Sequence, residues 1–494
     1  MSSRWLLALP FVVLVALFGP AALGAGWVLD DAHSLAVHQH DGQPWGEWTH
    51  ATYAWSKGTD SFQWRPLPAW LQHLMAMGAG RVPEGFRVLN MVAHMAVVAV
   101  GMGAIRAAGA STAVTALAGA ALVLHPAVAE VVPWSSCLPD ILLALVLVGA
   151  AWRSRAAVTP LRRAAEAVAF AFGACLCKES APALVPALAL AAWAGAGRRA
   201  AFAAGAGAAA GVGLFLGLHR WVTGQEFGDS LSGSVASWAL AGLDLIGGVP
   251  TLPARATAAH LFDGNAGAAA PIGLAVLAAM GWATWSLRGE AAQQRRWLAA
   301  WLGMAGLCVP AAVGIPLVGV QASRYLFVPW VWLVVMGAGP LAALVGGRRF
   351  ALLASVGVLV IWGPRTALRV AEYRDTATLF EAEWAIEPGN AYARANVGRH
   401  RVVSGIDRGG GLSMWASAID DLPPGVQVPD LRRERWDLGQ AAFLAGSFPL
   451  ALEQVSRLRM APGWLPPQIA CLEADSLDGL GRHEEATVAA KGCR

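Results

Sequence analysis

Two adjacent carboxylates, Asp30 and Asp31, follow the first long apolar segment of the chain, and His33 lies just beyond them. A carboxylate within hydrogen-bond reach can take a proton from a hydroxyl group, and arginine and lysine can bind phosphate. Ionisable residues inside a bilayer are costly, so they mark a substrate pathway or a catalytic centre by default. Further polar residues at membrane depth lie in "WRPL" (64–67) with Arg65, "LNMVAH" (89–94), "HPAVAEVVPWSSCLPD" (125–140) with His125, Glu130 and Asp140, "CKESAPALVP" (177–186) with Lys178 and Glu179, and "SRYLFVP" (323–329) with Arg324.

The apolar composition of the chain predicts a membrane protein built from helices. Of its 494 residues, 56% are hydrophobic and only 14% are charged, whereas an average soluble domain has about 25% charged residues. An uncharged apolar run of about 18 residues or more can cross the hydrocarbon core as a helix. We therefore predict an all-α polytopic membrane protein with about eleven transmembrane helices. The predicted spans are 5–29, 86–105, 112–132, 138–152, 164–178, 181–197, 200–219, 271–287, 297–319, 325–346 and 350–364.

The positions of the arginines predict the orientation of these spans. Cytoplasmic loops carry an excess of Lys and Arg, and with the N-terminus inside, every second predicted connection is basic. An odd number of spans then places Asp30, Asp31 and residues 365–494 outside, which in a bacterial inner membrane is the periplasm. The alternative for the first segment is a cleaved signal peptide, because "AALGAG" has the small residues of a cleavage site. The predicted inside loops hold Arg106; Arg153, Arg155, Arg162 and Arg163; Arg198 and Arg199; Arg288, Arg295 and Arg296; and Arg348 and Arg349.

The composition divides the chain into a membrane domain (1–364) and a C-terminal domain (365–494). Two outside loops, 31–85 and 220–270, belong to the membrane domain. The first loop is rich in Trp, a residue that favours the membrane interface. We therefore expect short helices on the membrane surface there.

The C-terminal domain contains a repeat. "LAGSFPLA" (444–451) and "LGRHEEA" (480–486) align on a Gly and an Ala, and "VVSGI" (402–406) suggests an earlier copy. A period of about 34 residues, with Gly at the turn and Ala where helices touch, resembles tetratricopeptide repeats, whose stacked helix pairs present a concave binding surface. A plain helical hairpin domain is the alternative.

Cys471 and Cys493 lie at similar distances on either side of the last predicted turn, near Gly481 and Arg482. Residues equidistant from the turn of two antiparallel helices lie side by side. We predict a disulfide between them, which would persist in an oxidising compartment such as the periplasm. Two unrelated buried thiols are the alternative.

Two predicted spans, 164–178 and 181–197, are too short for each to cross the membrane fully. Lys178 and Glu179 are therefore expected at a bend that faces a polar cavity, because irregular backbone at membrane depth survives only there. The 138–152 span is also short, so we expect the connection from His125 to Asp140 to reach the same cavity.

In their order along the chain, these motifs resemble the GT-C superfamily of membrane glycosyltransferases. The most similar members are the transmembrane and tetratricopeptide-repeat O-mannosyltransferases and their bacterial relatives. The resemblance rests on the acidic pair followed by His, then "WRPL", "N…H", "HP…E…W…D", "KES" and "RYL", and on the change to repeats after the last span. It implies transfer of a sugar from a polyprenyl-phosphate carrier to an acceptor hydroxyl, on a protein or an envelope glycan, at the non-cytoplasmic face.

Such a reaction needs a base at the acceptor hydroxyl and positive charge at the departing phosphate. The match to the family's first acidic position implies Asp30 as the base, with Asp31 orienting a neighbouring group. For the phosphate we expect Arg324 and Lys178, followed by Arg65. The structural alternatives are an interfacial role for Asp30 and pairing or snorkelling for the cations.

The remaining polar residues are expected on the acceptor side or the cavity wall. A buried structural role is the alternative for His125, and a divalent metal between Asp31 and Glu130 or Asp140 is conceivable, although no spacing requires one. The lipid-linked sugar would be the co-substrate. The residues in this group are His33, His125, Glu130, Asp140 and Glu179.

Other functions remain alternatives. Where the family often has "HPVHTEAV" and "SERYL", this chain has "HPAVAEVV" and "ASRYL". Such losses favour a non-catalytic scaffold that uses the repeat domain to assemble envelope partners. A transporter is disfavoured because no inverted repeat of broken segments is visible. No Gly-rich phosphate loop, Cys/His zinc cluster or nucleic-acid-binding patch occurs in the sequence.

Overall fold

The computed structural model describes residues 5–24, 26–27, 65–80, 82–178, 180–223, 278, 281–308, 323–344, 357–386, 388–421, 431–460 and 468–493. These residues form helices and turns, and no strand occurs among them. The predicted all-α class is therefore confirmed for the described part of the chain. The described chain divides into two compact units, and the second begins at Ala377.

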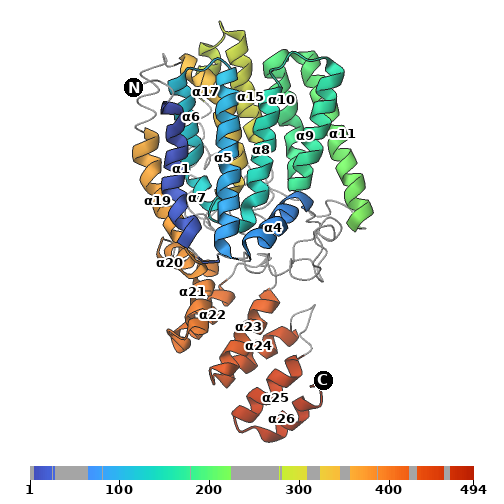
Figure 1. Ribbon diagram of the computed structural model, residues 1–494. Coiled ribbons are helices and arrows are strands. Elements are labelled where there is room, and N and C mark those ends of the chain that lie inside the picture. The colour runs from blue at the N-terminus through green and yellow to red at the C-terminus, as the bar shows by residue number, and fades with distance from the viewer. Residues whose placement is uncertain are drawn as a thin grey trace. The chain divides into compact units, whose positions relative to one another are not determined.

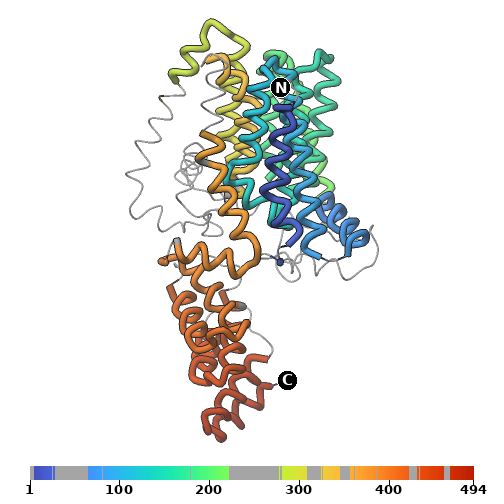
Figure 2. The backbone as a smooth tube through the Cα atoms, turned by 60° about the vertical axis from the view of Figure 1, so that its left-hand side comes forward, coloured from blue at the N-terminus to red at the C-terminus, as the bar shows by residue number. Residues whose placement is uncertain are grey.

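The first unit is a set of helices that run alongside one another (Figure 1). Figure 2 shows the same packing from another side. The long helices are α1 (Trp5–Gly24), α5 (Pro83–Ala107), α8 (Leu138–Arg153), α9 (Pro160–Cys177), α11 (Arg198–Thr223), α15 (Ala291–Leu307) and α17 (Phe327–Leu344). The shorter ones are α4 (Pro66–Ala79), α6 (Thr112–Leu124), α7 (Pro126–Val131), α10 (Leu184–Ala196) and α19 (Gly363–Glu372), with short 3₁₀ or π turns at η2 (Ser135–Cys137), η3 (Ala181–Ala183), η4 (Ser323–Leu326) and η5 (Val358–Trp362).

Prolines and capping side chains fix where these helices begin. Pro stands in the first turn of α5, α7, α8 and α9, where its missing N–H costs nothing. Ser111 accepts a hydrogen bond from the Val114 N–H at the start of α6, and Thr159 accepts one from Arg162 at the start of α9.

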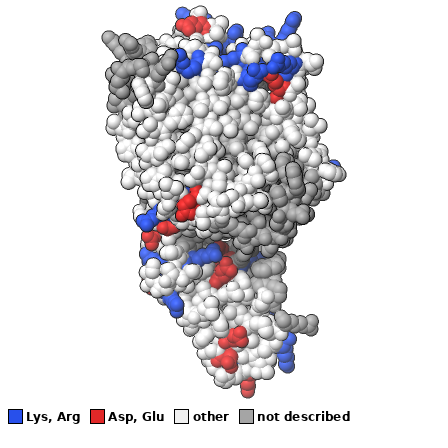
Figure 3. Space-filling view, in the orientation of Figure 1, with Lys and Arg blue, Asp and Glu red and all other residues white. Residues whose placement is uncertain are grey.

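Successive connections lie at two opposite ends of these helices. One end, which we call the basic end, comprises residues 104–110, 153–163, 195–199 and 288–296. These segments touch one another: Arg155 donates to the Ala104 carbonyl, Arg296 donates to the Ala108 carbonyl at 3.0 Å, and Gly195 packs against the backbone of Ser154. On the face shown in Figure 3, Lys and Arg gather at this end, and a broad uncharged band lies beyond them.

Among the described residues, five helical segments are long and apolar enough to cross a membrane. They are Trp5–Gly24, Pro83–Ala107, Ser135–Arg153, Arg198–Trp221 and Phe327–Leu344. They match five of the predicted spans, while α6 and the segment Ala181–Ala196 are apolar but shorter. Much of the apolar surface of α1 is exposed, including Trp5, Val12 and Leu23, as expected of a helix that faces lipid. The full count of eleven stays a prediction.

The structure differs from the predicted spans at two places. The predicted span 112–132 is broken at His125, which ends α6 and begins α7 with an extended backbone. The residue before a proline disfavours the helical conformation, and Pro126 follows His125 directly. The predicted domain boundary at 365 also differs, because α19 packs against α7 and α1 and the first unit extends to Thr376. Of the predicted interfacial loop 31–85, the described part contains α4 and the start of α5.

The second unit is made of helix pairs. After α20 (Thr376–Ile386) come α21 (Ala391–Ser404) with α22 (Arg408–Asp420), α23 (Leu431–Leu444) with α24 (Phe448–Met460), and α25 (Ile469–Gly479) with α26 (His483–Ala490). Each pair turns at a glycine with positive φ: Gly405 at 73°, Gly446 at 75° and Gly481 at 75°. These are the glycines on which the sequence repeat aligns, because only Gly adopts this backbone without strain.

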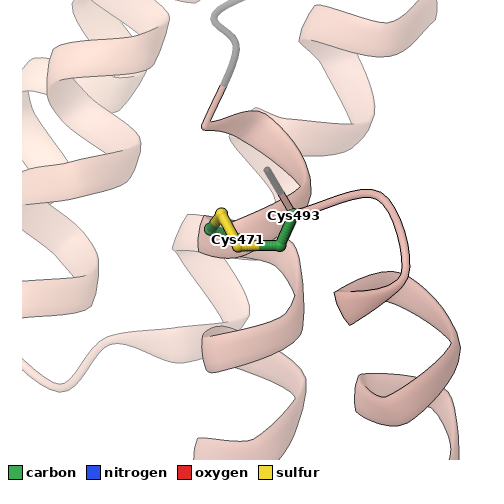
Figure 4. The surroundings of a disulfide bond; sticks show 2 residues. All are labelled: Cys471 and Cys493. Atoms are coloured by element: carbon green, nitrogen blue, oxygen red, sulfur yellow. A yellow bond between two sulfur atoms is a disulfide. The ribbon is translucent and has the colours of Figure 1, made fainter.

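A disulfide joins the two helices of the last pair. Cys471 on α25 and Cys493 after α26 are bonded, with their Cα atoms 4.8 Å apart (Figure 4). This separation lies within the range of about 4.4–6.8 Å that disulfides require. The predicted pairing is confirmed.

Candidate functional site

A buried ion pair lies where α8 begins and α9 ends. The Lys178 ammonium is 2.5 Å from Asp140 Oδ1, and the two side chains are 9% and 8% exposed. The predicted break at Lys178 is present: α9 ends at Cys177, and Lys178 has an extended backbone with φ −158° and ψ 140°. Two residues that are 38 positions apart in the sequence are thus joined in the interior.

The two helix ends favour the charges of this pair. Asp140 lies in the first turn of α8, where the helix dipole is positive, and Lys178 caps the C-terminus of α9, where it is negative. Burying two charges is costly even when they are paired. Oriented helix ends offset part of that cost, so the pair is held in place from both sides.

A second pair of charged residues lies beside the first. The backbone N–H of Arg324 donates to Glu130 Oε2 at 3.1 Å, and the Arg324 guanidinium lies 4.1 Å from the centre of the Trp134 ring. The buried thiol of Cys137 interacts electrostatically with Glu130, Asp140, Lys178 and Arg324. The four charged side chains therefore converge around one residue. We call these five residues the charged cluster.

Three polar side chains bind the backbone of residues 133–135, which lie between Glu130 and Cys137 of the charged cluster. Asn90 on α5 donates to the Trp134 carbonyl at 2.8 Å, and Gln72 on α4 donates to the Ser135 carbonyl at 3.1 Å. Arg87 on α5 is fully buried and donates to the Pro133 carbonyl at 2.8 Å. Side chains of α4 and α5 thus hold the backbone from 133 to 135.

Arg87 also binds the end of the first helix. Its guanidinium donates to the Ala21 carbonyl at 3.2 Å and to the Gly26 carbonyl. The Trp27 ring packs beside Phe86, with centroids 5.9 Å apart. The last described residues before Asp30 therefore lie at the same end of the helices as Pro133, which we call the site end.

The other predicted site residues are placed differently. His125 caps α7 by accepting from the Ala127 N–H at 3.2 Å, and its ring stacks on Trp330 at 4.2 Å. Within the described chain no contact joins His125 to the Asp140–Lys178 pair, so the structural alternative describes it better. Arg65 is the half-buried residue that precedes α4, the helix that carries Gln72. Four predicted site residues lie outside the described part of the chain: Asp30, Asp31, His33 and Glu179.

The described residues provide no metal-binding group. No three His, Cys, Asp or Glu side chains among them lie close enough together to hold a metal ion. Asp140 is bonded to Lys178, and Glu130 accepts from Arg324. The predicted metal partner of these carboxylates, Asp31, is not among the described residues.

Arg87 was not among the predicted site residues, although its sequence carries a signal. It lies inside the predicted span 86–105, where a charged residue is costly and functional by default. Cys137 and Trp134 carry no such signal, because an apolar residue inside an apolar stretch does not stand out. Cys137 lies among the four charges of the cluster, and Trp134 lies against Arg324, because of how the helices pack.

Comparison of the chain with protein-family models, curated proteins and solved structures found no match. The chemistry of the charged cluster therefore has to follow from its own residues. A lysine and an arginine can bind a phosphate, and two carboxylates beside them can orient a polar acceptor.

Proposed function

We propose that this protein is an integral membrane glycosyltransferase of the GT-C type, which transfers a sugar from a polyprenyl-phosphate donor to an acceptor hydroxyl. The proposal rests on the Asp140–Lys178 ion pair and the Glu130–Arg324 contact, whose four charged residues all act on the Cys137 thiol. A lipid-phosphate donor keeps its tail in the bilayer and needs cations near the membrane boundary. The charged cluster offers two such cations at the site end of helices long enough to cross a membrane.

Under this proposal Lys178 and Arg324 stabilise the departing phosphate. The Arg324 guanidinium lies over the Trp134 ring, and a guanidinium has paired N–H groups that match the geometry of phosphate oxygens. Asp140 fixes the position of the Lys178 ammonium. Positive charge that is already in place when the bond breaks costs no reorganisation during the reaction.

Asp30 is proposed as the base that accepts the proton of the attacking hydroxyl. Two residues separate it from Trp27, which lies at the site end through its contact with Phe86. Eleven spans with a cytoplasmic basic end would place this end and the C-terminal domain in the periplasm. The alternation of connections between the two ends supports that arrangement.

The test is sugar transfer by membranes that contain the full-length protein, with a panel of radiolabelled polyprenyl-phosphate sugars. We expect the wild-type chain to use at least one donor, and Lys178→Met and Asp140→Asn to abolish transfer. Arg162→Gln is the matched control, because it removes a charge that pairs with Glu166 on the surface of α9. Equal transfer by wild type, Lys178→Met and Asp140→Asn would place the reaction elsewhere. The absence of transfer from every donor in the panel would contradict the proposal that the protein is a glycosyltransferase.

A scaffold is the second candidate, and the helix pairs of the second unit favour it. Three consecutive pairs with the same turn glycine form the kind of repeat that binds other chains. A scaffold would lose its envelope partners when residues 391–493 are deleted, while Asp140→Asn would leave partner binding unchanged. The tetratricopeptide type of these pairs is part of this proposal.

A further inference from the structure

Three arginines surround the C-terminal end of α5 at the basic end. Arg155 donates to the carbonyl of Ala104, Arg296 Nη1 donates to that of Ala108 at 3.0 Å, and Arg106 Nη1 donates to that of Ala110 at 2.8 Å. The arginines come from three different places in the sequence: the last turn of α5, the residues after α8, and the first half of α15. The fold therefore brings three guanidinium groups to one short turn.

These guanidinium groups are not neutralised by the described carboxylates. In the ranges that the structure describes, none of the three forms an ion pair. Glu166 at this end is bonded to Arg153 and Arg162, and Glu290 makes no ion pair with any described residue. The end of a helix carries only about half a negative charge, which does not balance three arginines.

The nearby positive charges affect the pKa of Arg155. Burial and then the nearby Arg296 lower the pKa of the Arg155 side chain to about 10. Arg155 still keeps its charge at neutral pH, so the repulsion from Arg296 persists in the folded protein. A bound anion would remove that repulsion, and a guanidinium has five N–H groups, more than one carbonyl can use.

The position of Trp152 indicates where such an anion comes from. Its ring packs over Gly103 on α5, where any side chain larger than hydrogen would meet the indole at 3.1 Å. Trp152 is 44% exposed and lies at the end of a helix that could cross a membrane. Tryptophan favours the level of the lipid head groups, and Trp152 precedes Arg155 by three residues and packs against Gly103, three residues before Arg106.

We propose that Arg106, Arg155 and Arg296 form a binding site for the phosphate head group of an anionic membrane lipid. The site is separate from the charged cluster, because about 20 Å of α8 lies between Asp140 and Arg153 at 1.5 Å per residue. It does not depend on the proposed transfer reaction. Basic pockets between membrane helices recognise lipid phosphates through paired N–H groups and charge.

The test is lipid retention by the purified full-length protein in a neutral detergent. Native mass spectrometry would count bound dioleoylphosphatidylglycerol, with dioleoylphosphatidylcholine as the uncharged comparison. We expect preferential binding of the anionic lipid. The double variant Arg155→Gln/Arg296→Gln should bind it about 30-fold more weakly, since each arginine near the surface contributes about fivefold.

The matched control is Arg198→Gln/Arg199→Gln, which removes two exposed arginines at the same end and should bind like the wild type. Arg106→Gln is the second variant if the double variant does not fold, because its side chain is exposed, and a loss of about fivefold is expected. Equal losses in the control pair, or no loss in Arg106→Gln, would overturn the site. Displacement of the lipid by millimolar inorganic phosphate would show that a free anion, and not a lipid, is the ligand.

Discussion

Lys178 and Asp140 form an ion pair of 2.5 Å inside the protein, with both side chains less than a tenth exposed. Removing one partner leaves an uncompensated buried charge, which costs about 3–5 kcal/mol. We predict such a loss for Lys178→Met and for Asp140→Asn alone, and a smaller loss for the double variant. Thermal unfolding in detergent would measure it.

The same three variants separate stability from activity. If the pair serves the phosphate, the double variant regains stability but transfers no sugar. If the pair only supports the fold, the double variant regains both. Glu166→Gln is the control, since its pairs with Arg153 and Arg162 lie at the surface and contribute about 1 kcal/mol or less.

Arg87 is predicted to position the site rather than to touch the substrate. Its guanidinium binds the carbonyls of Ala21, Gly26 and Pro133, and hydrogen bonds to a charged group contribute about 1.5–3 kcal/mol each. Arg87→Met should therefore destabilise the protein strongly, and Arg87→Lys should recover part of the loss. In Arg87→Lys we expect a lower kcat with KM little changed, measured by transfer kinetics. A change in KM alone would indicate that Arg87 contacts the donor.

Asp30 and Asp31 are predicted to differ although they are neighbours in the sequence. Asp30→Asn should reduce transfer by about 10²–10⁴-fold, the usual contribution of a positioned base, while the protein stays folded and inserted. Asp31→Asn should retain measurable activity. Turnover at the wild-type rate in Asp30→Asn would assign the base to another residue.

The disulfide predicts the count of reactive thiols. The chain has 6 cysteines, of which Cys137, Cys175, Cys177 and Cys308 are free. Maleimide labelling of the denatured, unreduced protein should modify these four, and labelling after reduction should modify the remaining two as well. Cys471→Ala/Cys493→Ala should lower the stability of the second unit by about 3 kcal/mol. Six reactive thiols before reduction would contradict both the bond and an oxidising compartment.

Two glycines of the second unit give opposite predictions. A Cβ on Gly398 would lie 2.7 Å from the Trp415 nitrogen and 2.8 Å from the Gly411 carbonyl oxygen, so Gly398→Ala should destabilise the α21–α22 pair by about 1–3 kcal/mol. A Cβ on Gly409 meets nothing within 4 Å. Gly409→Ala should be neutral or stabilising by up to about 1 kcal/mol, because Ala favours helices. Unfolding by denaturant would compare the two, and equal effects would argue against the close approach of α21 and α22.

The turns and the breaks of this fold were predictable because local chemistry determines them. Gly446 and Gly481 aligned in the sequence, and both adopt positive φ. The break at Lys178 followed from two apolar segments too short to cross. The break at His125 was not predicted. Pro126 indicates it, but a hydropathy profile does not show a helix boundary inside a continuous apolar run.

The site was predictable in its residue types but not in its pairings. Charged residues at membrane depth identify Asp140, Lys178 and Arg324, whereas hydropathy says nothing of how a helix is rotated about its axis. The bond between Asp140 and Lys178, and the place of Cys137 among four charges, depend on that rotation. The hydrogen bonds of Arg87 to Ala21, Gly26 and Pro133 were not predictable for the same reason. Their acceptors are backbone carbonyls, which every residue has.

The three backbone carbonyls that Arg87 binds are synthesised at different times during translation. Of the acceptors of Arg87, Ala21 and Gly26 are synthesised before it, but Pro133 follows 46 residues later. At a ribosome speed of about 5–20 residues per second, this delay is about 2–9 s. During that time α5 carries into the membrane an arginine that lacks one of its native acceptors. We therefore expect the insertion machinery to keep α5 beside α1, which supplies the Ala21 acceptor, until Pro133 has been synthesised.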